Sequence, residues 1–245
     1  TTTLVYAAGE LAATGAPVIE GVDFYQADLP VAVGAPNIAN LTLTNGIAAP
    51  PFVSAGSLDP LSVMAQPTNG ALIFFNQRSG GSGDLMSATP GQPGLTTLVA
   101  NVKEVTSIER AGPDVFVDLV RSNGPKNREL FRFTAPFAPS TQPLLSVPGL
   151  HSFERYAARA DGWLAFVQVA GVQQHLWRFD PAAALLDEMN RAFQFGPTLG
   201  WMPSGELAFS LGASAVPSLF AAWPTTSGAH RLPLPVGPGF VLPGV

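Results

Sequence analysis

Three carboxyl groups in this chain have the type and spacing to act together in hydrolysis, those of Asp59, Glu104 and Glu154. Cleavage of a glycosidic bond needs two such groups, one as general acid and the other as base or nucleophile. Each of the three lies just before or inside a predicted strand that would face a common axis. With 17 acidic residues in the chain, three solvated charges near one axis are also expected by chance. We therefore expect no enzyme and no catalytic residue, and keep the three as candidate binding residues.

The cysteine content, the histidines and the glycine-rich run indicate neither a metal or cofactor site nor nucleophilic catalysis. The absence of cysteine excludes a disulfide, a thiolate nucleophile and a Cys-ligated metal. The histidines His151, His175 and His230 lack the close spacing of paired ligands, and we expect them at the surface or at strand edges. The glycine-rich run 80–84 has a single aspartate and no Lys-Ser/Thr pair, so it is predicted to be a hairpin loop. We expect no cofactor and no metal.

Aromatic side chains favour a binding role. The chain has four tryptophans and three tyrosines, which could stack on a sugar or anchor a protein partner. Most are expected in the core, because sheets that pack face to face require large side chains between them. Trp201 stands beside a predicted turn and is expected to be the most exposed, so it joins the candidate binding residues.

A two-strand repeat that occurs five times must position these residues. The first strand is a short apolar run: Leu4-Val5-Tyr6, Leu72-Ile73-Phe74, Val115-Phe116-Val117, Leu164-Ala165-Phe166 and Leu207-Ala208-Phe209. The second is a polar residue followed by two apolar ones: Asp23-Phe24-Tyr25, Asp84-Leu85-Met86, Glu129-Leu130-Phe131, His175-Leu176-Trp177 and Ser218-Leu219-Phe220. A unit of this size cannot bury its apolar faces alone and must pack on its neighbours.

The spacing of the repeat predicts a five-bladed β-propeller. With one exception, successive first strands are separated by roughly the 40–50 residues that four short antiparallel strands and their turns require. The exception is explained by residues 45–60, where Gly and Pro interrupt any regular ladder. We therefore predict one all-β domain, residues 1–245, of five four-stranded antiparallel blades with a long loop at about 45–60. The apolar C-terminal segment 239–245 is predicted to join the first blade and close the ring.

The fourth unit gives the expected blade in most detail. The innermost strand is predicted at 153–156, the second at 163–169 and the third at 175–180. The segment 181–190 is predicted to form a turn and an outer strand near 185–189, because it is too short for a stable helix. Four units carry a glycine in the turn after the innermost strand, where φ is expected to be positive: Asn69-Gly70, Gly112-Pro113, Asp161-Gly162 and Ser204-Gly205.

One stretch resembles the repeat of TolB-like (WD40-like) propellers, in which Pro-x-Trp-Ser-Pro-Asp-Gly precedes an Ile-Ala-Phe strand. It reads Gly196-Pro197-Thr198-Leu199-Gly200-Trp201-Met202-Pro203-Ser204-Gly205-Glu206-Leu207-Ala208-Phe209-Ser210, with one added residue between Pro and Trp. Met202 stands for the family serine and Ser204 for the aspartate. The segment Leu176-Trp177-Arg178-Phe179-Asp180 is similar to that family's Ile-Tyr-x-x-Asp run. The resemblance covers one unit well and the other four loosely.

Charge and hydropathy exclude two classes of partner. Only 12% of the residues are charged, the formal net charge is −5, and the only lysines are Lys103 and Lys126, so no basic stripe is available for nucleic acid. No run of about eighteen apolar residues is free of Pro, Gly and charge, so no membrane span is expected. The start of the chain has no signal-peptide pattern, as expected of a secreted chain whose signal has been removed or of a cytosolic chain.

The resemblance implies a periplasmic or cell-surface protein that binds partner proteins at the mouth of a central channel, and related repeats cap the active site of some peptidases. Because propellers serve many functions, the fold alone assigns none. We expect a non-catalytic extracytoplasmic binding or scaffold protein, periplasmic, cell-surface or secreted, that recognises a protein or glycan through its loop faces or channel mouth. The alternatives are a glycoside hydrolase that uses channel carboxylates and a structural subunit of a surface assembly.

Overall fold

The chain is all-β wherever its structure is described, as the sequence predicts. A computed structural model describes residues 2–11, 19–29, 38–40, 64–65, 71–77, 82–89, 95–123, 126–212, 218–222 and 230–232. Within these ranges every regular element is a strand, and no helix is present that could cross a bilayer. The strands fall into two compact units, Thr1–Arg110 with Asp114–Ser146, and Ala111–Pro113 with Val147–Val245.

The first unit begins with a three-stranded sheet. β1 (Thr2–Leu11) pairs antiparallel with β2 (Ile19–Leu29), whose other side pairs with β3 (Ile38–Asn40). Among the described strands, β1 is therefore at one edge of this sheet. The predicted long loop 45–60 and the predicted closing segment 239–245 lie outside the described residues.

A seven-stranded sheet, in the order β10-β9-β8-β7-β6-β5-β4, comes next in the chain. Its strands are β4 (Met64–Ala65), β5 (Leu72–Gln77), β6 (Gly83–Ala88), β7 (Thr96–Ala111), β8 (Asp114–Arg121), β9 (Asn127–Thr134) and β10 (Leu145–Pro148). The prediction of two separate four-stranded sheets here is wrong, because β7 is one strand of 16 residues shared by both repeats. Its first half pairs with β6 up to Val102, and its other neighbour in the sheet is β8.

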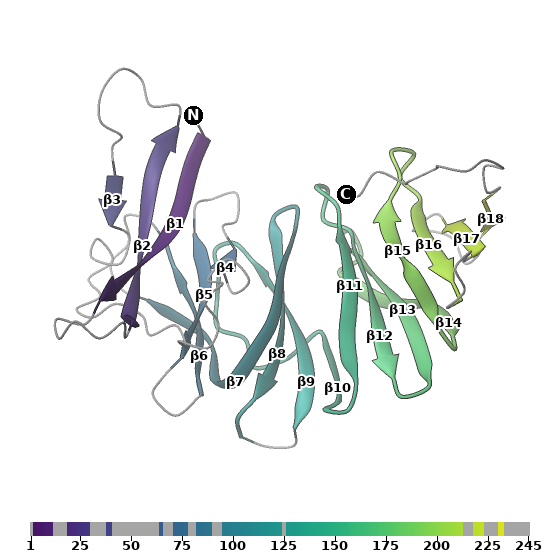
Figure 1. Ribbon diagram of the computed structural model, residues 1–245, viewed down its shortest axis with the longest axis horizontal. Helices are drawn as coiled ribbons and strands as arrows, with labels where there is room; N and C mark the ends of the chain where they lie inside the picture. The colour runs from purple at the N-terminus through teal and green to yellow at the C-terminus, as the bar shows by residue number, and fades with distance from the viewer. Residues whose placement is uncertain are drawn as a thin grey trace. The chain divides into compact units, whose positions relative to one another are not determined.

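The second unit contains two sheets of four strands each, as predicted for the fourth and fifth repeats (Figure 1). The first consists of β11 (Ser152–Ala158), β12 (Leu164–Ala170), β13 (Gln173–Asp180) and β14 (Leu185–Ala192), in chain order. The second consists of β15 (Phe195–Trp201), β16 (Leu207–Leu211), β17 (Ser218–Ala222) and β18 (His230–Arg231). The prediction of a turn followed by an outer strand at 181–190 is confirmed by β14.

All five predicted repeats have the same strand register. In each, the last residue of the first signature lies opposite the last residue of the second: Tyr6 and Tyr25, Phe74 and Met86, Val117 and Phe131, Phe166 and Trp177, and Phe209 and Phe220. A shift of one residue would turn every side chain of a strand to the opposite face. The five strand pairs are therefore equivalent structural units, which the sequence pattern had identified correctly.

Apolar strands of this kind form the core of each unit. In the first unit the buried cluster extends over β5 to β9 of the seven-stranded sheet and includes Val117 and Phe131. In the second unit the buried cluster joins the two sheets, with Val167 and Leu176 from one and Phe209 from the other. Burial of an aromatic or large aliphatic side chain contributes about 1.5–3 kcal/mol. In the second unit, each sheet therefore depends on the other for stability.

Glycines with positive φ end the innermost strands, as predicted from the turn sequences. The φ angles of Gly112, Gly162 and Gly205 are 57°, 102° and 91°. Non-glycine residues adopt such angles at a cost of about 1–2 kcal/mol. The fourth predicted turn, at Asn69-Gly70, lies outside the described residues.

Candidate functional site

Glu154 is the candidate residue with the best-defined surroundings. It lies on β11, the edge strand of its sheet, and its side chain is 46% exposed. The hydroxyl of Ser152 donates a hydrogen bond to Glu154 Oε1 at 2.9 Å, and Arg155 Nη2 lies 3.6 Å from Glu154 Oε2. The carboxylate is therefore held in place by its own strand while it still faces solvent.

A β-bulge at the next residue sets the direction of this part of β11. The pairing of β11 with β12 shifts between Glu154 and Ala157, and Arg155 has a φ of 54°. The guanidinium of Arg155 donates to the backbone oxygen of Phe195 at 2.6 Å and to that of Gly196, at the start of β15. Bulges of this kind redirect side chains at the ends and edges of sheets. Arg155 thereby ties the edge strand of one sheet to the adjacent sheet of the same unit.

The same four-residue pattern occurs one repeat earlier in the chain. Ser107-Ile108-Glu109-Arg110 on β7 matches Ser152-Phe153-Glu154-Arg155 on β11, and Ser107 Oγ again donates to Glu109 Oε1, at 3.2 Å. Burial raises the pKa of the Glu109 carboxyl above its ordinary value, and the bond from Ser107 opposes this effect only partly. We did not identify Glu109 from the sequence, although comparison of the repeats for a shared Ser-x-Glu-Arg pattern would have found it.

Of the other two candidate carboxylates, one belongs to the other unit and one lies outside the described residues. Glu104 is exposed on β7 in the first unit, whereas Glu154 belongs to the second. Asp59 lies outside the described residues. Use of these carboxylates for glycoside hydrolysis therefore stays a prediction.

Trp201 is not the exposed aromatic residue that the sequence predicts. It is partly buried against the core of the second unit, and its indole N–H donates to the backbone oxygen of Ala157 at 3.1 Å. The ring meets that of Trp163 edge to face, with centroids 6.3 Å apart, and the guanidinium of Arg159 lies 4.9 Å from its centroid. These contacts explain Trp201 as a packing residue that joins two sheets. Its proposed binding role stays untested.

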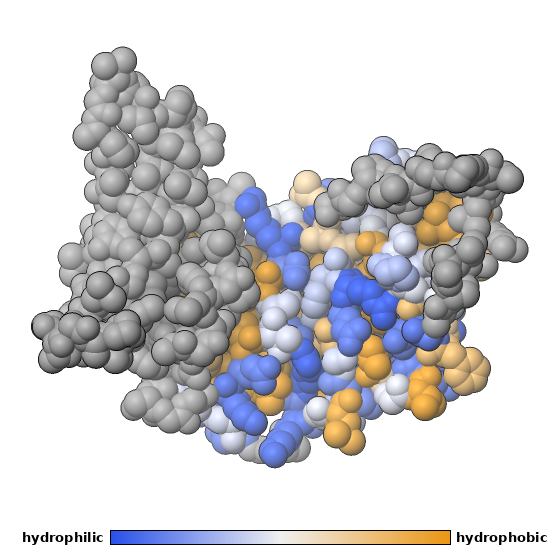
Figure 2. Space-filling view, viewed as in Figure 1, coloured by the Kyte–Doolittle hydropathy of each residue, from blue (hydrophilic) through white to orange (hydrophobic). Residues whose placement is uncertain are grey.

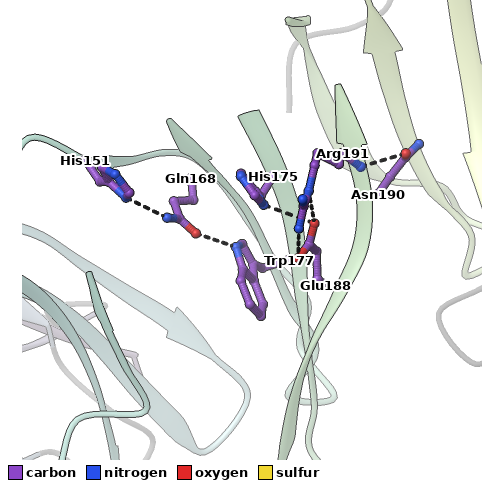
Figure 3. A network of polar contacts seen from close by, with 7 residues as sticks. All are labelled: His151, Gln168, His175, Trp177, Glu188, Asn190 and Arg191. Atoms are coloured by element: carbon purple, nitrogen blue, oxygen red, sulfur yellow. Dashed lines mark hydrogen bonds and ion pairs between the residues drawn. The ribbon is translucent and has the colours of Figure 1, made fainter. Parts of the chain in front are cut away.

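A polar chain crosses the β11–β14 sheet near one of its ends (Figure 3). Trp177 Nε1 donates to Gln168 Oε1 at 2.8 Å, and Gln168 Nε2 lies 3.0 Å from His151 Nδ1. The bond from Trp177 fixes the orientation of the Gln168 amide, so its NH2 group donates to His151. His151 Nδ1 must then be the unprotonated nitrogen of the ring, which leaves the other ring nitrogen, Nε2, as the one that carries hydrogen.

A second, separate group of polar side chains lies on β13 and β14 (Figure 3). Glu188 accepts hydrogen bonds from Arg191 at 3.0 and 3.2 Å, and its Oε1 lies 3.0 Å from His175 Nδ1. The bonds from Arg191 hold the pKa of Glu188 below its ordinary value, and the bond to His175 adds to this effect. Two histidines expected at the surface or at strand edges, His151 and His175, thus belong to polar groups at one sheet. Among the residues described, no three His, Asp or Glu side chains gather as metal ligands would.

Comparisons with known proteins show similarity of structure but not of sequence. No protein-family model matches the chain, and no curated protein matches it. A puromycin-hydrolyzing peptidase from Mycobacterium tuberculosis is similar with a TM-score of 0.49 and 16% identity over 93% of this chain and 35% of that one. A protein from Lactobacillus plantarum has a TM-score of 0.49 and 13% identity over 94% and 66%. TolB from Acinetobacter baumannii has a TM-score of 0.39 and 12% identity over 95% and 58%.

The all-β fold follows from the strand registers of this chain itself. The expectation that the chain is not an enzyme is contradicted, because several similar structures are puromycin hydrolases. The chain spans 35–38% of the length of those proteins and 66% of the one from Lactobacillus plantarum.

Proposed function

We propose that the chain forms a five-bladed β-propeller that binds a protein or glycan ligand through the loop ends of its blades, outside the cytoplasm. The five equivalent strand pairs support five blades, since each pair carries the same register. In this proposal β7 serves as the outer strand of one blade and the innermost strand of the next. The segment 239–245 would complete the first blade.

The observation that carries the binding role is the solvent-facing carboxylate of Glu154. Ser152 and Arg155 hold it in position before any ligand arrives, so that little side-chain entropy is lost when a donor binds to it. Amide, amine and hydroxyl groups are the donors that a carboxylate accepts, and proteins and glycans both present them. The proposal therefore names a binding surface around Glu154 on β11.

The full chain can be tested against a glycan array and against fractionated cell-envelope proteins. We expect saturable binding to a ligand of one class, weakened at least tenfold in Glu154→Gln. The matched control is Asp161→Asn, because Asp161 is likewise exposed, at 53%, and paired with an arginine, Arg159, but lies in the turn beyond the other end of β11. This control should bind within about twofold of the wild type. Absence of saturable binding in both assays, or equal binding by Glu154→Gln, would contradict the proposal.

The proposed compartment has a separate test. Fractionation of the source cells, followed by immunoblotting for this chain, should find it in the envelope or in the medium. Recovery of the chain with cytoplasmic markers would contradict an extracytoplasmic location and would leave the binding experiment unaffected.

A further inference from the structure

The side chains of Gln168, His175 and Trp177 lie on one face of the β11–β14 sheet. Gln168 on β12 is opposite Phe153 of β11 and opposite His175 of β13, and opposite residues of antiparallel strands point to the same face. Trp177 follows His175 by two residues and therefore points to this face as well. His151, just before β11, joins them through its hydrogen bond to Gln168 (Figure 3).

The direction of each hydrogen bond between these side chains is fixed by their chemistry. An indole nitrogen can only donate, so Gln168 Oε1 accepts from Trp177 Nε1 at 2.8 Å. The amide nitrogen of Gln168, which can only donate, then lies 3.0 Å from His151 Nδ1. His151 therefore completes this chain of bonds only as a neutral ring whose Nδ1 is an acceptor.

A protonated His151 does not fit this arrangement. An imidazolium ring carries hydrogen on both nitrogens, so its Nδ1–H group and the NH2 group of Gln168 would face each other as two donors. Reversal of the Gln168 amide would only move the conflict, because the NH2 group would then face the indole N–H of Trp177. Gln168 is 6% exposed, so water has little access to replace a lost bond.

His175 has the opposite hydrogen-bond polarity. The bonds from Arg191 hold the pKa of Glu188 below its ordinary value, so this carboxylate is ionised and can only accept. His175 Nδ1, 3.0 Å from Glu188 Oε1, is therefore a donor. Protonation of His175 leaves this bond in place and adds an ion pair to it.

The charged groups around His151 do not take part in its contact. β10, which leads into the turn before His151, and β12 contain no titratable side chain. On β11, Glu154 points to the face opposite Phe153, and Arg155 is bonded to the backbone of β15. The charged side chains of β13 and β14 are His175, Glu188 and Arg191 on the face of Gln168, and Arg178, Asp180 and Asp187 on the other. In the described part of the chain, the His151 ring has Gln168 as its hydrogen-bond partner and no ion-pair partner.

We propose that the bond between Gln168 and His151 is a pH-sensitive contact, which protonation of His151 breaks so that the start of β11 is released. The backbone N–H of His151 closes a turn by donating to the oxygen of Pro148 at 2.8 Å, and the next residue, Ser152, holds the Glu154 carboxylate. Apolar residues reach the described surface in places, shown in orange in Figure 2, and Leu150 beside His151 is 96% exposed. Solvent protons therefore reach this turn. The contact goes beyond the proposed binding function and does not depend on it.

NMR spectra of the full chain with isotope-labelled histidine rings test the polarity directly. At neutral pH we expect hydrogen on Nε2 of His151 and on Nδ1 of His175, two patterns that the ring nitrogen shifts distinguish. Each signal is assigned by its disappearance in His151→Asn or His175→Asn. A His151 ring with its hydrogen on Nδ1 at neutral pH would overturn the proposal.

Thermal melts at about pH 7.5 and about pH 5, between which an ordinary histidine gains its proton, test the response to acid. In His151→Asn the side-chain oxygen replaces Nδ1 as an acceptor and cannot be protonated. A hydrogen bond lost at this position lowers the melting temperature of a chain of this length by about 2–4 °C. The melting temperature of His151→Asn should therefore fall on acidification by about 2–4 °C less than that of the wild type. An equal fall in both proteins overturns the proposal.

His175→Asn is the matched control, because it removes a histidine of the same sheet with the opposite polarity. Its melting temperature should fall more than that of the wild type on acidification, since it lacks the ion pair that acid adds to Glu188. A change of the same sign in His151→Asn and His175→Asn would mean that hydrogen-bond polarity does not decide the response, against the proposal.

Trp177→Phe provides a second test if His151→Asn does not fold. Without the indole N–H, the Gln168 amide is free to reverse and to present its oxygen to a protonated His151. The fall in melting temperature between the two pH values should then be smaller than in the wild type, whatever the stability of this variant at neutral pH. An undiminished fall would overturn the proposal.

Discussion

Phe209 on β16 stacks on Phe220 of β17, with ring centroids 5.9 Å apart and ring planes 18° apart. The two residues are partners in the strand register, at the position that every one of the five repeats fills with a matched pair. Cross-strand pairs of this kind stabilise a sheet by about 0.2–1 kcal/mol relative to an Ala–Ala pair. The repeated sequence signature therefore marks a cross-strand contact that stabilises the sheet.

Replacement of Phe209 by alanine should destabilise the protein strongly, because its ring is 1% exposed and also contacts Phe195. Truncation of a buried phenylalanine costs about 3–5 kcal/mol, and in a chain of this length that corresponds to a melting temperature lower by about 10 °C. Phe193→Ala is the control, since that ring is 82% exposed. Calorimetric melting of both variants checks the prediction, and equal melting temperatures would refute it.

Substitution of Arg128 should lower the free energy of unfolding, because it leaves the buried carboxylate of Asp118 without its cation. Asp118 on β8 is 0% exposed and accepts hydrogen bonds from Arg128 at 2.8 to 3.1 Å. Leaving a buried carboxylate without its cation lowers stability by about 3–5 kcal/mol, whereas replacement of both partners by apolar residues costs far less. Urea unfolding should therefore rank Arg128→Met as less stable than the double variant Asp118→Leu/Arg128→Met. If the double variant unfolded at a lower urea concentration than Arg128→Met, the ion pair would not be needed to neutralise Asp118.

Two glycines with similar φ angles should respond differently to alanine. At Gly112 a Cβ would lie 2.8 Å from the backbone oxygen of Ala160 and 2.9 Å from the nitrogen of Gly162, whereas at Gly171 nothing lies within 4 Å. Gly171→Ala should cost only the backbone strain, about 1 kcal/mol. Gly112→Ala adds a clash with backbone atoms and should cost about 3 kcal/mol or more. Equal losses of stability in thermal melts would mean that the turn at Gly112 has room to adjust.

The pH dependence of stability should reveal the burial of Glu109. Because its pKa is raised on folding, the folded protein binds this proton more tightly than the unfolded chain does. The contribution of Glu109 to the free energy of unfolding then falls as pH rises from the ordinary pKa of 4.5 through the pKa of the folded state. Glu109→Gln removes the charge, so its melting temperature relative to the wild type should be higher at pH 7 than at pH 4. A difference that does not vary with pH would contradict this.

Glu188 should show the opposite behaviour, since its pKa is lowered on folding by Arg191 and His175. Its stabilising contribution is present above the ordinary value of 4.5 and is lost as pH falls through the folded pKa. Glu188→Gln should therefore lower the melting temperature at pH 7 and have a smaller effect at pH 3. A larger effect in acid than at neutral pH would show that these ion pairs do not stabilise the folded sheet.

The strands and turns were predictable from the sequence because their signals are local. Apolar runs such as 164–166 and the turn at Gly162 carry the information for a strand and for a positive φ within a few residues. The shared strand β7 was not predictable in this way. Its 16 residues contain no Gly or Pro that would end it, and only its pairing with two neighbours shows that it serves both repeats.

The candidate site was predicted less well, because side-chain surroundings depend on residues far apart in the chain. The turn beside Trp201 predicts exposure, but the backbone oxygen that accepts its N–H belongs to Ala157, 44 residues away. Glu109 was not predictable as a single carboxylate, because only the Ser-x-Glu-Arg pattern shared by two repeats distinguishes it from other acidic residues. Glu154 was predictable because it lies inside an expected innermost strand, but the bulge at Arg155 that orients it has no local sequence signal.

The proposal that five blades surround one axis is tested most directly by an experimental structure of the full chain by crystallography. The account predicts five blades, with Tyr6 opposite Tyr25 in the first blade and residues 239–245 paired along β1. Two stacked sheets, or a ring with any other number of blades, would contradict it.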